Sequence, residues 1–212
     1  GVGFIPQTTS VYTVTGTDTK GCKSTKSLNL IVNPKPNAKI QGNAEICNGQ
    51  SEILTASGGN QYLWNNGSPT SSITANLEGT YTVTVTDING CIDITSHQLK
   101  VNELPVIDIA GDLEICEGSI SILTASGCQS YLWNNEIPTQ SITVTAANDY
   151  SVIGIDQNGC TSSKTVTVKV NSLPDAKISG DLEICEGRST LLVASGGNKF
   201  QWNNGQINNS LN

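Results

Sequence analysis

The chain has little of what enzymes and nucleic-acid-binding proteins use. Its 212 residues include one histidine, no methionine and 5% aromatic residues, and 18 acidic side chains stand against 11 basic ones. The net charge of −7 argues against nucleic acid, which needs a basic surface, and against electrostatic docking on anionic membranes. The chain has no uninterrupted apolar run of the roughly 18 residues that a membrane span needs. We therefore expect neither nucleic-acid binding nor membrane insertion.

What the chain does have is a repeat of 69 residues. Cys47, Cys116 and Cys185 are separated by 116 − 47 = 69 and 185 − 116 = 69 positions. Other residues keep the same step: Trp64, Trp133 and Trp202; Pro36, Pro105 and Pro174; Cys22, Cys91 and Cys160; Asp18, Asp87 and Asp156. A fixed period indicates one structural unit copied in tandem.

The repeat predicts the domain organisation. Residues 34–102 and 103–171 are expected to be whole repeats. Residues 1–33 are expected to be the C-terminal half of another repeat, and 172–212 the N-terminal half of a further one. A chain that opens and ends in mid-unit and lacks methionine is typical of a slice from a longer protein.

No catalytic chemistry repeats with the period. The single histidine, His97, has the apolar counterparts Leu28 and Val166 one period away. It is therefore interpreted as an ordinary strand side chain. We expect no enzyme activity, no catalytic residue, no bound metal and no cofactor.

Alternation of side chains predicts an all-β fold. Tyr81, Val83 and Val85 alternate with threonines, a period of two that is typical of strands. In 34–102 strands are expected at 37–40, 51–57, 61–64, 71–76, 80–86 and 91–102, with 44–50 as a connection that carries Cys47. Short strands separated by frequent turns indicate an antiparallel β-sandwich of immunoglobulin type.

Repeated aromatic residues define the expected core. It comprises Trp64, Trp133, Trp202, Tyr81 and Tyr150, and the tyrosines stand where immunoglobulin-like domains place a corner tyrosine. Leu63, Leu132 and Gln201 vary between the tyrosine (or phenylalanine) and the tryptophan of each copy, so they are expected to face water. Short joints with prolines predict a head-to-tail rod.

Several motifs of residues 36–91 together resemble a known family. They are Pro-x-Ala-x-Ile-x-Gly, Glu-Ile-Cys-x-Gly, Leu-Thr-Ala-Ser-Gly-Gly, Tyr-Leu-Trp-Asn-Asn-Gly and Gly-x-Tyr-Thr-Val-Thr-Val-Thr-Asp-x-Asn-Gly-Cys. The chain resembles the immunoglobulin-like and PKD-like tandem repeats of very large Bacteroidota surface proteins, such as gliding-motility adhesins exported by type IX secretion. Asn65-Asn66-Gly67 replaces the Asp-rich PKD hallmark, which favours the immunoglobulin-like branch.

The recurrent aspartates have two interpretations. Asp18, Asp87 and Asp156 each precede a glycine by three residues, a pattern typical of a turn. The alternative is a calcium site at the joint, built from Asp87, Glu103, Asp108 and Asp112. Against it, Glu103 corresponds to Ser172, and Asp108 corresponds to Lys39 and Lys177.

The cysteines predict disulfides and an oxidising, extracellular setting, because they recur without histidine partners. Three pairings fit the repeat. Cys47–Cys91 and Cys116–Cys160 lie within a unit; Cys22–Cys47, Cys91–Cys116 and Cys160–Cys185 span a linker; Cys47–Cys160 crosses a joint. We favour Cys47–Cys160, because the turn with Cys91 and the connection with Cys47 should lie at opposite ends of a sandwich. Cys22, Cys91, Cys116 and Cys185 would then pair with units outside 1–212. Cys128, whose counterparts are glycines, is expected to be an unpaired thiol; the alternative is an intermolecular bridge.

Three functional hypotheses follow. The first is a non-catalytic stalk or filament segment of a giant cell-surface adhesin, whose partners are neighbouring repeats and filament neighbours. The second is an immunoglobulin-like module that binds carbohydrate or protein through exposed loops. The third is a set of accessory repeats in a secreted hydrolase.

Overall fold

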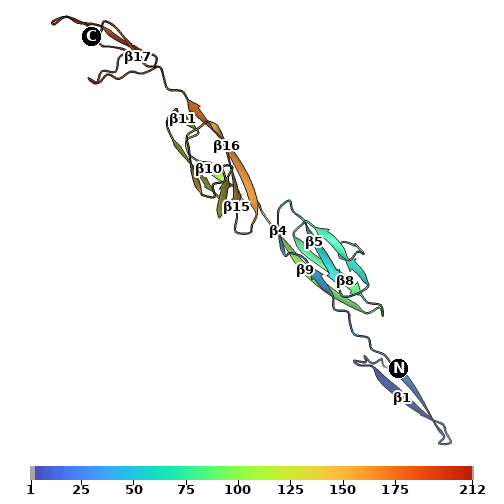
Figure 1. Cartoon of the computed structure of the whole chain (residues 1–212). Helices are drawn as coiled ribbons and strands as arrows, with labels where there is room; N and C mark the ends of the chain where they lie inside the picture. Colours follow the sequence, from blue (N-terminus) through green and yellow to red (C-terminus); the bar gives the residue numbers. More distant parts are fainter. Residues whose placement is uncertain (1–2, 212) are drawn as a thin grey trace. The chain divides into compact units, whose positions relative to one another are not determined.

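The computed structural model describes residues 3–211 (Figure 1), and all regular structure in this range is β-strand. The described residues include no helix long and apolar enough to cross a membrane. The chain divides into two compact units, Gly1–Leu104 and Pro105–Asn212.

The first unit contains a two-sheet sandwich formed by residues 34–102, here called the first repeat. Its strands are β3 (Lys39–Gln41), β4 (Glu45–Cys47), β5 (Glu52–Ser57), β6 (Gln61–Trp64), β7 (Ser72–Ala75), β8 (Gly79–Thr86) and β9 (Ile92–Asn102). One sheet has the order β3-β5-β7 and the other β4-β9-β8-β6. All pairs are antiparallel except β4 with β9.

The second unit repeats this topology in residues 103–171, here called the second repeat. Its strands are β10 (Asp108–Ala110), β11 (Glu114–Cys116), β12 (Ser121–Ser126), β13 (Ser130–Trp133), β14 (Ser141–Val144), β15 (Asn148–Ile155) and β16 (Thr161–Asn171). The orders are β10-β12-β14 and β11-β16-β15-β13. Seven strands in two sheets define an immunoglobulin-like sandwich, which confirms the predicted all-β fold of immunoglobulin type.

The segment predicted as a connection at 44–50 contains a strand, so that part of the prediction is wrong. Residues Glu45–Cys47 form β4, which lies parallel to the end of β9 with Ile46 opposite Val101. Ile46 is buried in the core, while Glu45 faces outward. Three residues suffice for a strand here because β4 pairs with the edge of β9 that faces away from β8, whose backbone groups need partners.

Each sandwich has one aromatic centre. Trp64 and Trp133 are almost fully buried, with 2% and 1% of their surface exposed, and their indole nitrogens donate to the carbonyls of Thr70 and Thr139. Tyr81 and Tyr150 are half-buried rather than buried, because their hydroxyls reach the surface and donate to Leu77 O and Ala146 O at 2.9 and 3.1 Å. Four residues separate donor and acceptor, as in a tyrosine corner.

The two ends of the chain form fewer strands than predicted. Residues 1–33 contain a hairpin, β1 (Ser10–Thr17) with β2 (Lys23–Leu30). The repeat predicts another strand at 2–7, the counterpart of 71–76, which lies partly outside the described residues and is not formed over 3–7. Its counterpart β7 pairs only with β5, whose equivalent is not in 1–33.

Residues 172–212 contain β17 (Lys177–Ser179), β18 (Leu192–Ser195) and β19 (Ser210–Leu211) in one sheet. The repeat also predicts a strand at 199–202, the counterpart of 61–64. It is not formed, and Trp202 is half-buried rather than a core residue. The reason is again the missing partner: β6, the counterpart in the first repeat, pairs only with β8. The sheet that forms is the one whose three strands pair among themselves.

Candidate functional site: the cysteine-bearing ends of the repeats

Cys47 lies at the end of the first repeat where the chain leaves it. It is buried and opposite Asn102, the last residue of β9. The backbone around it is fixed by Asn48 N–H donating to Asn102 O at 2.8 Å and by Gln50 N–H donating to Cys47 O at 2.9 Å. The side chain of Gln50 accepts from Cys47 N–H at 3.2 Å. These hydrogen bonds therefore fix the position of the Cys47 backbone at this end of β4.

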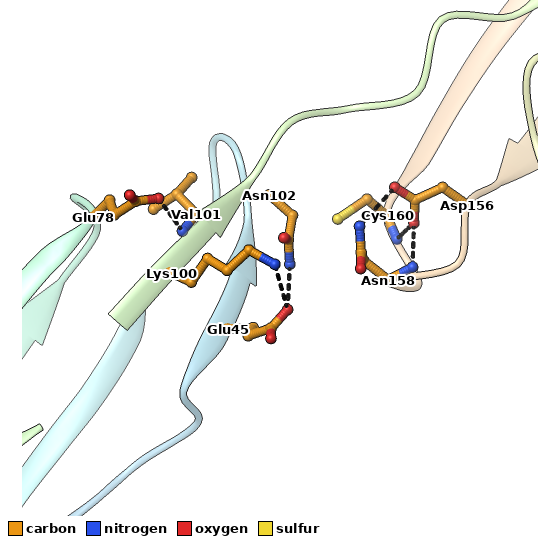
Figure 2. Close-up of polar contacts among 8 residues, drawn as sticks. All are labelled: Glu45, Glu78, Lys100, Val101, Asn102, Asp156, Asn158 and Cys160. Atoms are coloured by element: carbon orange, nitrogen blue, oxygen red, sulfur yellow. Dashed lines mark hydrogen bonds and ion pairs between the residues drawn. The ribbon is translucent and has the colours of Figure 1, made fainter. Parts of the chain in front are cut away.

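Polar contacts hold β4 against β9 (Figure 2). The Asn102 side chain donates to Glu45 Oε2 at 2.8 Å, and Lys100 Nζ lies 3.5 Å from the same oxygen. The amide hydrogen bond, with the Lys100 charge second, lowers the pKa of Glu45 below its usual value. On the next residue of β9, Val101 N–H donates to Glu78 Oε2 at 3.2 Å. The exit end is thus tied by side chains as well as by the sheet.

The second repeat has the same arrangement at its own exit end. Asn171 Nδ2 donates to Glu114 Oε1 at 2.9 Å, and Glu117 N–H donates to Asn171 O at 2.8 Å. Cys116 stands where Cys47 stands in the first repeat, but it is exposed. The hydrogen bonds that position the cysteine at the exit end are therefore common to both repeats.

Cys160 lies in the tight turn between β15 and β16. Asp156 Oδ1 accepts from the backbone N–H groups of Asn158 and Cys160, both at 2.8 Å (Figure 2). Asp156 N–H in turn donates to Cys160 O at 3.0 Å. Gly159, at φ +79°, occupies the left-handed position that glycine fills without strain.

The other two copies of the turn are built identically. Asp18 accepts from Lys20 and Cys22 N–H at 2.9 and 2.8 Å. Asp87 accepts from Asn89 and Cys91 N–H at 2.9 and 2.8 Å. The prediction that these aspartates form turns is confirmed, and each one fixes the backbone of a cysteine.

This turn lies at the end where the chain enters the repeat. In the second repeat Lys164, four residues after Cys160, forms an ion pair of 2.7 Å with Asp108 at the start of β10. In the first repeat Ala38 N–H donates to Asp93 Oδ2 at 3.1 Å. Each repeat therefore carries one cysteine at its exit end and one at its entry end.

The two ends are far apart within one repeat. Cys91 immediately precedes β9 and Cys47 pairs with its last residue. β9 has 11 residues, which span roughly 35 Å at about 3.4 Å per residue. A disulfide needs Cα atoms within about 7 Å, so the within-unit pairing is sterically excluded.

The oxidation states agree with this geometry. Cys47 and Cys160 are disulfide-bonded, whereas Cys22, Cys91, Cys116, Cys128 and Cys185 are free thiols. Every within-unit and linker-spanning pairing requires at least one of these free thiols. Both alternatives are therefore unformed in this structure.

Cys128 occupies a different environment. It lies in the turn before β13 and packs against the core of the second repeat. Burial, with the charge of Asp156 second, raises the pKa of its thiol. Such a thiol is less reactive than an exposed one, because the thiolate is the nucleophile.

The candidate calcium ligands are engaged elsewhere. Asp108 binds Lys164, which lowers the pKa of its carboxyl, Glu103 accepts from Asn48, and Asp87 closes its own turn. Asp112 is exposed. His97 contacts the carbonyl of Asn43 at 3.0 Å. In the described part of the chain, no three His, Cys, Asp or Glu residues gather as a metal site would require.

The sequence interpretation missed the asparagine clamp on β4. Its signal was present, since Asn33, Asn102 and Asn171 recur before the joints and Glu45, Glu114 and Glu183 recur two residues before a cysteine. The shared 69-residue step of the two sets could have indicated that they contact each other.

Comparison with protein-family models finds no match, and neither does comparison with curated proteins. Among solved structures, murine CEACAM1b is similar with 10% identity and a TM-score of 0.33, over 64% of this chain and 100% of that one. The eight N-terminal immunoglobulin domains of Down Syndrome Cell Adhesion Molecule give 17% identity and a TM-score of 0.33, over 91% and 36%. SGBP-B of Bacteroides ovatus, solved with a mixed-linkage heptasaccharide, gives 14% and 0.19, over 81% and 54%.

These values add nothing to the fold that the strand order already defines. The neighbours include multidomain adhesion and binding proteins, and the chain spans only about a third of the Down Syndrome Cell Adhesion Molecule fragment.

Proposed function

We propose that this chain is a non-catalytic stalk segment of a large extracellular surface protein, of the type found in Bacteroidota adhesins exported by type IX secretion. Its repeats act as spacers that hold a functional tip away from the cell. The joint between repeats is stiffened by a disulfide between Cys47 of one repeat and Cys160 of the next.

Chain connectivity supports the joint. Five residues, 103–107, separate β9 from β10, and a linker of that length reaches roughly 20 Å at most. The exit end of the first repeat carries Cys47 and the entry end of the second carries Cys160. A linker of this length permits the two ends to approach closely enough for the sulfurs to meet.

The main support for the proposal is which of the cysteines are disulfide-bonded and which are free. Of seven cysteines, the two that are disulfide-bonded are one exit-end residue and one entry-end residue of successive repeats. A bond of this kind at every joint would pair Cys91 with the preceding repeat and Cys116 with the following one. By the chain-entropy argument a loop of about 100 residues stabilises by up to about 5 kcal/mol.

Small-angle scattering of the 212-residue chain tests the stalk. We expect the oxidised chain to give a narrow distribution of interatomic distances that broadens on reduction. The Cys47→Ser/Cys160→Ser variant should reproduce the reduced profile without reductant, and Cys128→Ser, the matched control, should not. Identical profiles for the oxidised chain and the double variant would count against a stiffened joint.

A second function, direct protein binding, has one observation in its favour. Leu63, Thr84 and Ile94 form a row across β6, β8 and β9, and Leu63 and Ile94 are 55% and 61% exposed. The strip is aliphatic, whereas carbohydrate sites use aromatic platforms. Retention of a protein ligand by the chain, lost in Leu63→Ser/Ile94→Ser, would favour this function over the stalk.

A further inference from the structure

Three core positions differ together between the two repeats. In the first repeat they are Ala38, Gly59 and Val85. One period of 69 residues later they are Ile107, Cys128 and Gly154. The first two lie in the part of the repeat that contains β3 to β7, and the third lies in the long hairpin, a name used here for β8–β9 and its counterpart β15–β16.

In the first repeat a side chain of the long hairpin, Val85, fills the core space at these positions. Val85 is fully buried and fills the space beside Gly59. A Cβ placed on Gly59 would lie only 2.5 Å from Val85 Cγ1 and 2.7 Å from Thr86 O. The pair therefore excludes any larger residue at position 59 while Val85 is present.

In the second repeat the same space is filled by Cys128 and Ile107, which lie outside the long hairpin. A Cβ placed on Gly154 would overlap Cys128 Sγ and would lie 2.9 Å from Cys128 Cβ and 3.0 Å from Ile107 Cδ1. Ile107 is buried and Cys128 packs against the same core. The turn itself is held alike in both repeats, since Tyr62 and Tyr131 donate to the carbonyls of Gly59 and Cys128, both at 2.8 Å.

We propose that these three positions form a volume-matched set that selects which long hairpin each repeat accepts. A valine hairpin placed in the second repeat would collide with Cys128 and Ile107. A glycine hairpin placed in the first would leave a cavity between Ala38 and Gly59. Both mismatches destabilise a close-packed core.

Selection of the correct hairpin would matter in the proposed stalk, where similar repeats follow one another. This role rests on the proposed tandem arrangement. Successive repeats with nearly the same strands can exchange hairpins, and such misassembly is a characteristic failure of repeat proteins. A mismatch at the three positions penalises exchange between the first and second repeats. In this interpretation the free thiol of Cys128 has a structural role, because it packs against Gly154 in the core.

The same set assigns partners to the remaining segments. Residues 172–212 carry Ala176 and Gly197, and a hairpin that completes them is expected to carry a valine-like residue at the position of Val85. The β1–β2 hairpin carries Gly16 at that position and matches a half like that of the second repeat. The two segments therefore do not match each other, in one chain or between copies.

A thermodynamic cycle in the second repeat of the 212-residue chain tests the set. Gly154→Val is added to the native background and to Ile107→Ala/Cys128→Gly, and thermal unfolding is followed with hydrogen exchange of β15–β16. The β8–β9 hairpin in the same molecule is the internal control. We expect Gly154→Val to lower the midpoint of the second repeat by more than about 10 °C in the native background.

In the Ile107→Ala/Cys128→Gly background the same change should raise the midpoint, because the valine fills the space released. This comparison remains informative even if the single Gly154→Val repeat fails to fold. An equal loss in both backgrounds, or a triple variant less stable than the double, would overturn the matched set. None of these results depends on the joint disulfide or on the stalk.

Crossing the hairpins tests partner selection. In Val85→Gly/Gly154→Val each hairpin matches the other repeat, so we expect refolding from denaturant to yield exchanged dimers and larger species by light scattering. The native chain should stay monomeric under the same conditions. A monomeric crossed variant with native protection in both hairpins would overturn the selection.

Discussion

Glu136 is the one non-glycine residue at positive φ among the described residues, at +62°. Its counterparts are Gly67 and Gly205, at +84° and +86°. The turn is otherwise unchanged, because Glu136 N–H donates to Trp133 O as Gly67 N–H donates to Trp64 O, both at 2.9 Å. The glutamate therefore adopts a backbone conformation that costs an L-residue about 1–2 kcal/mol.

We expect Glu136→Gly to stabilise the second repeat by about 1 kcal/mol, since glycine relieves this strain at some cost in chain entropy. Gly67→Ala, the matched control, should destabilise the first repeat by a similar amount. Chemical denaturation followed by hydrogen exchange would resolve the two repeats. A destabilising Glu136→Gly would mean that the glutamate side chain compensates for its backbone.

The corner tyrosines give a second prediction at this scale. Tyr81→Phe and Tyr150→Phe each remove one hydrogen bond to a carbonyl while keeping the ring, so each should cost about 1 kcal/mol in unfolding free energy. Tyr12→Phe is the control, because Tyr12 is the counterpart of Tyr81 in the β1–β2 hairpin and its ring contacts Phe4. Equal effects at all three positions would show that the corner bond contributes nothing.

Single residues differ in how far the sequence predicts them. The buried tryptophans follow from alternation and recurrence, because every copy needs the same centre. The half-exposed Tyr81 does not, since its hydroxyl must reach a carbonyl at the surface. The compensation between Cys128 and Gly154 could be recovered only by comparing the copies position by position, because neither residue is unusual alone.

At the scale of elements, β4 depends on a titratable clamp. The Asn102 hydrogen bond and Lys100 lower the pKa of Glu45. A carboxyl whose pKa is lower in the folded state than in the unfolded chain stabilises above the unfolded value and loses that contribution as pH falls through the folded one. Amides of β4 should therefore exchange faster, relative to β5, at pH 3 than at pH 6 once intrinsic rates are corrected.

Glu45→Gln should remove this pH dependence while keeping the Asn102 partner. Asn102→Ala should increase exchange in β4 at both pH values, because it removes the stronger of the two contacts. If the native chain and Glu45→Gln lose protection equally on acidification, another group controls the strand.

The cysteine turns give a further prediction. Asp156→Ala removes the carboxylate that holds Cys160 N–H, so it should destabilise the turn by about 1 kcal/mol and speed reduction of the Cys160 disulfide. Asp87→Ala is the matched control with the same turn and a free Cys91: it should lower stability alike and leave the disulfide unaffected. Unchanged reduction kinetics in Asp156→Ala would show that the turn does not protect the Cys160 disulfide.

Elements were predictable where strands pair locally and less so where they depend on distant partners. The hairpins β8–β9 and β15–β16 follow from alternation and a turn motif. The short strand β4 did not, because three residues carry too little pattern and its partner lies over 50 positions away. The same dependence explains why no strand forms around Trp202.

At the level of the whole molecule, the proposed stalk function depends on which cysteines form disulfides. Sandwich geometry places the exit-end and entry-end cysteines of one repeat roughly 35 Å apart, so the sequence could exclude the within-unit bond once the strand directions were known. Spacing alone permits three pairings, so the preference for Cys47–Cys160 depended on the predicted strand directions.

A peptide map of the oxidised 212-residue chain under non-reducing conditions identifies the disulfide partners. Free thiols are alkylated first, and the chain is then digested without reductant. We expect a peptide with Cys47 linked to one with Cys160, and alkylated Cys22, Cys91, Cys116, Cys128 and Cys185. Cys47 linked to Cys91, or Cys160 linked to Cys116, would contradict both the joint disulfide and the strand directions on which it rests.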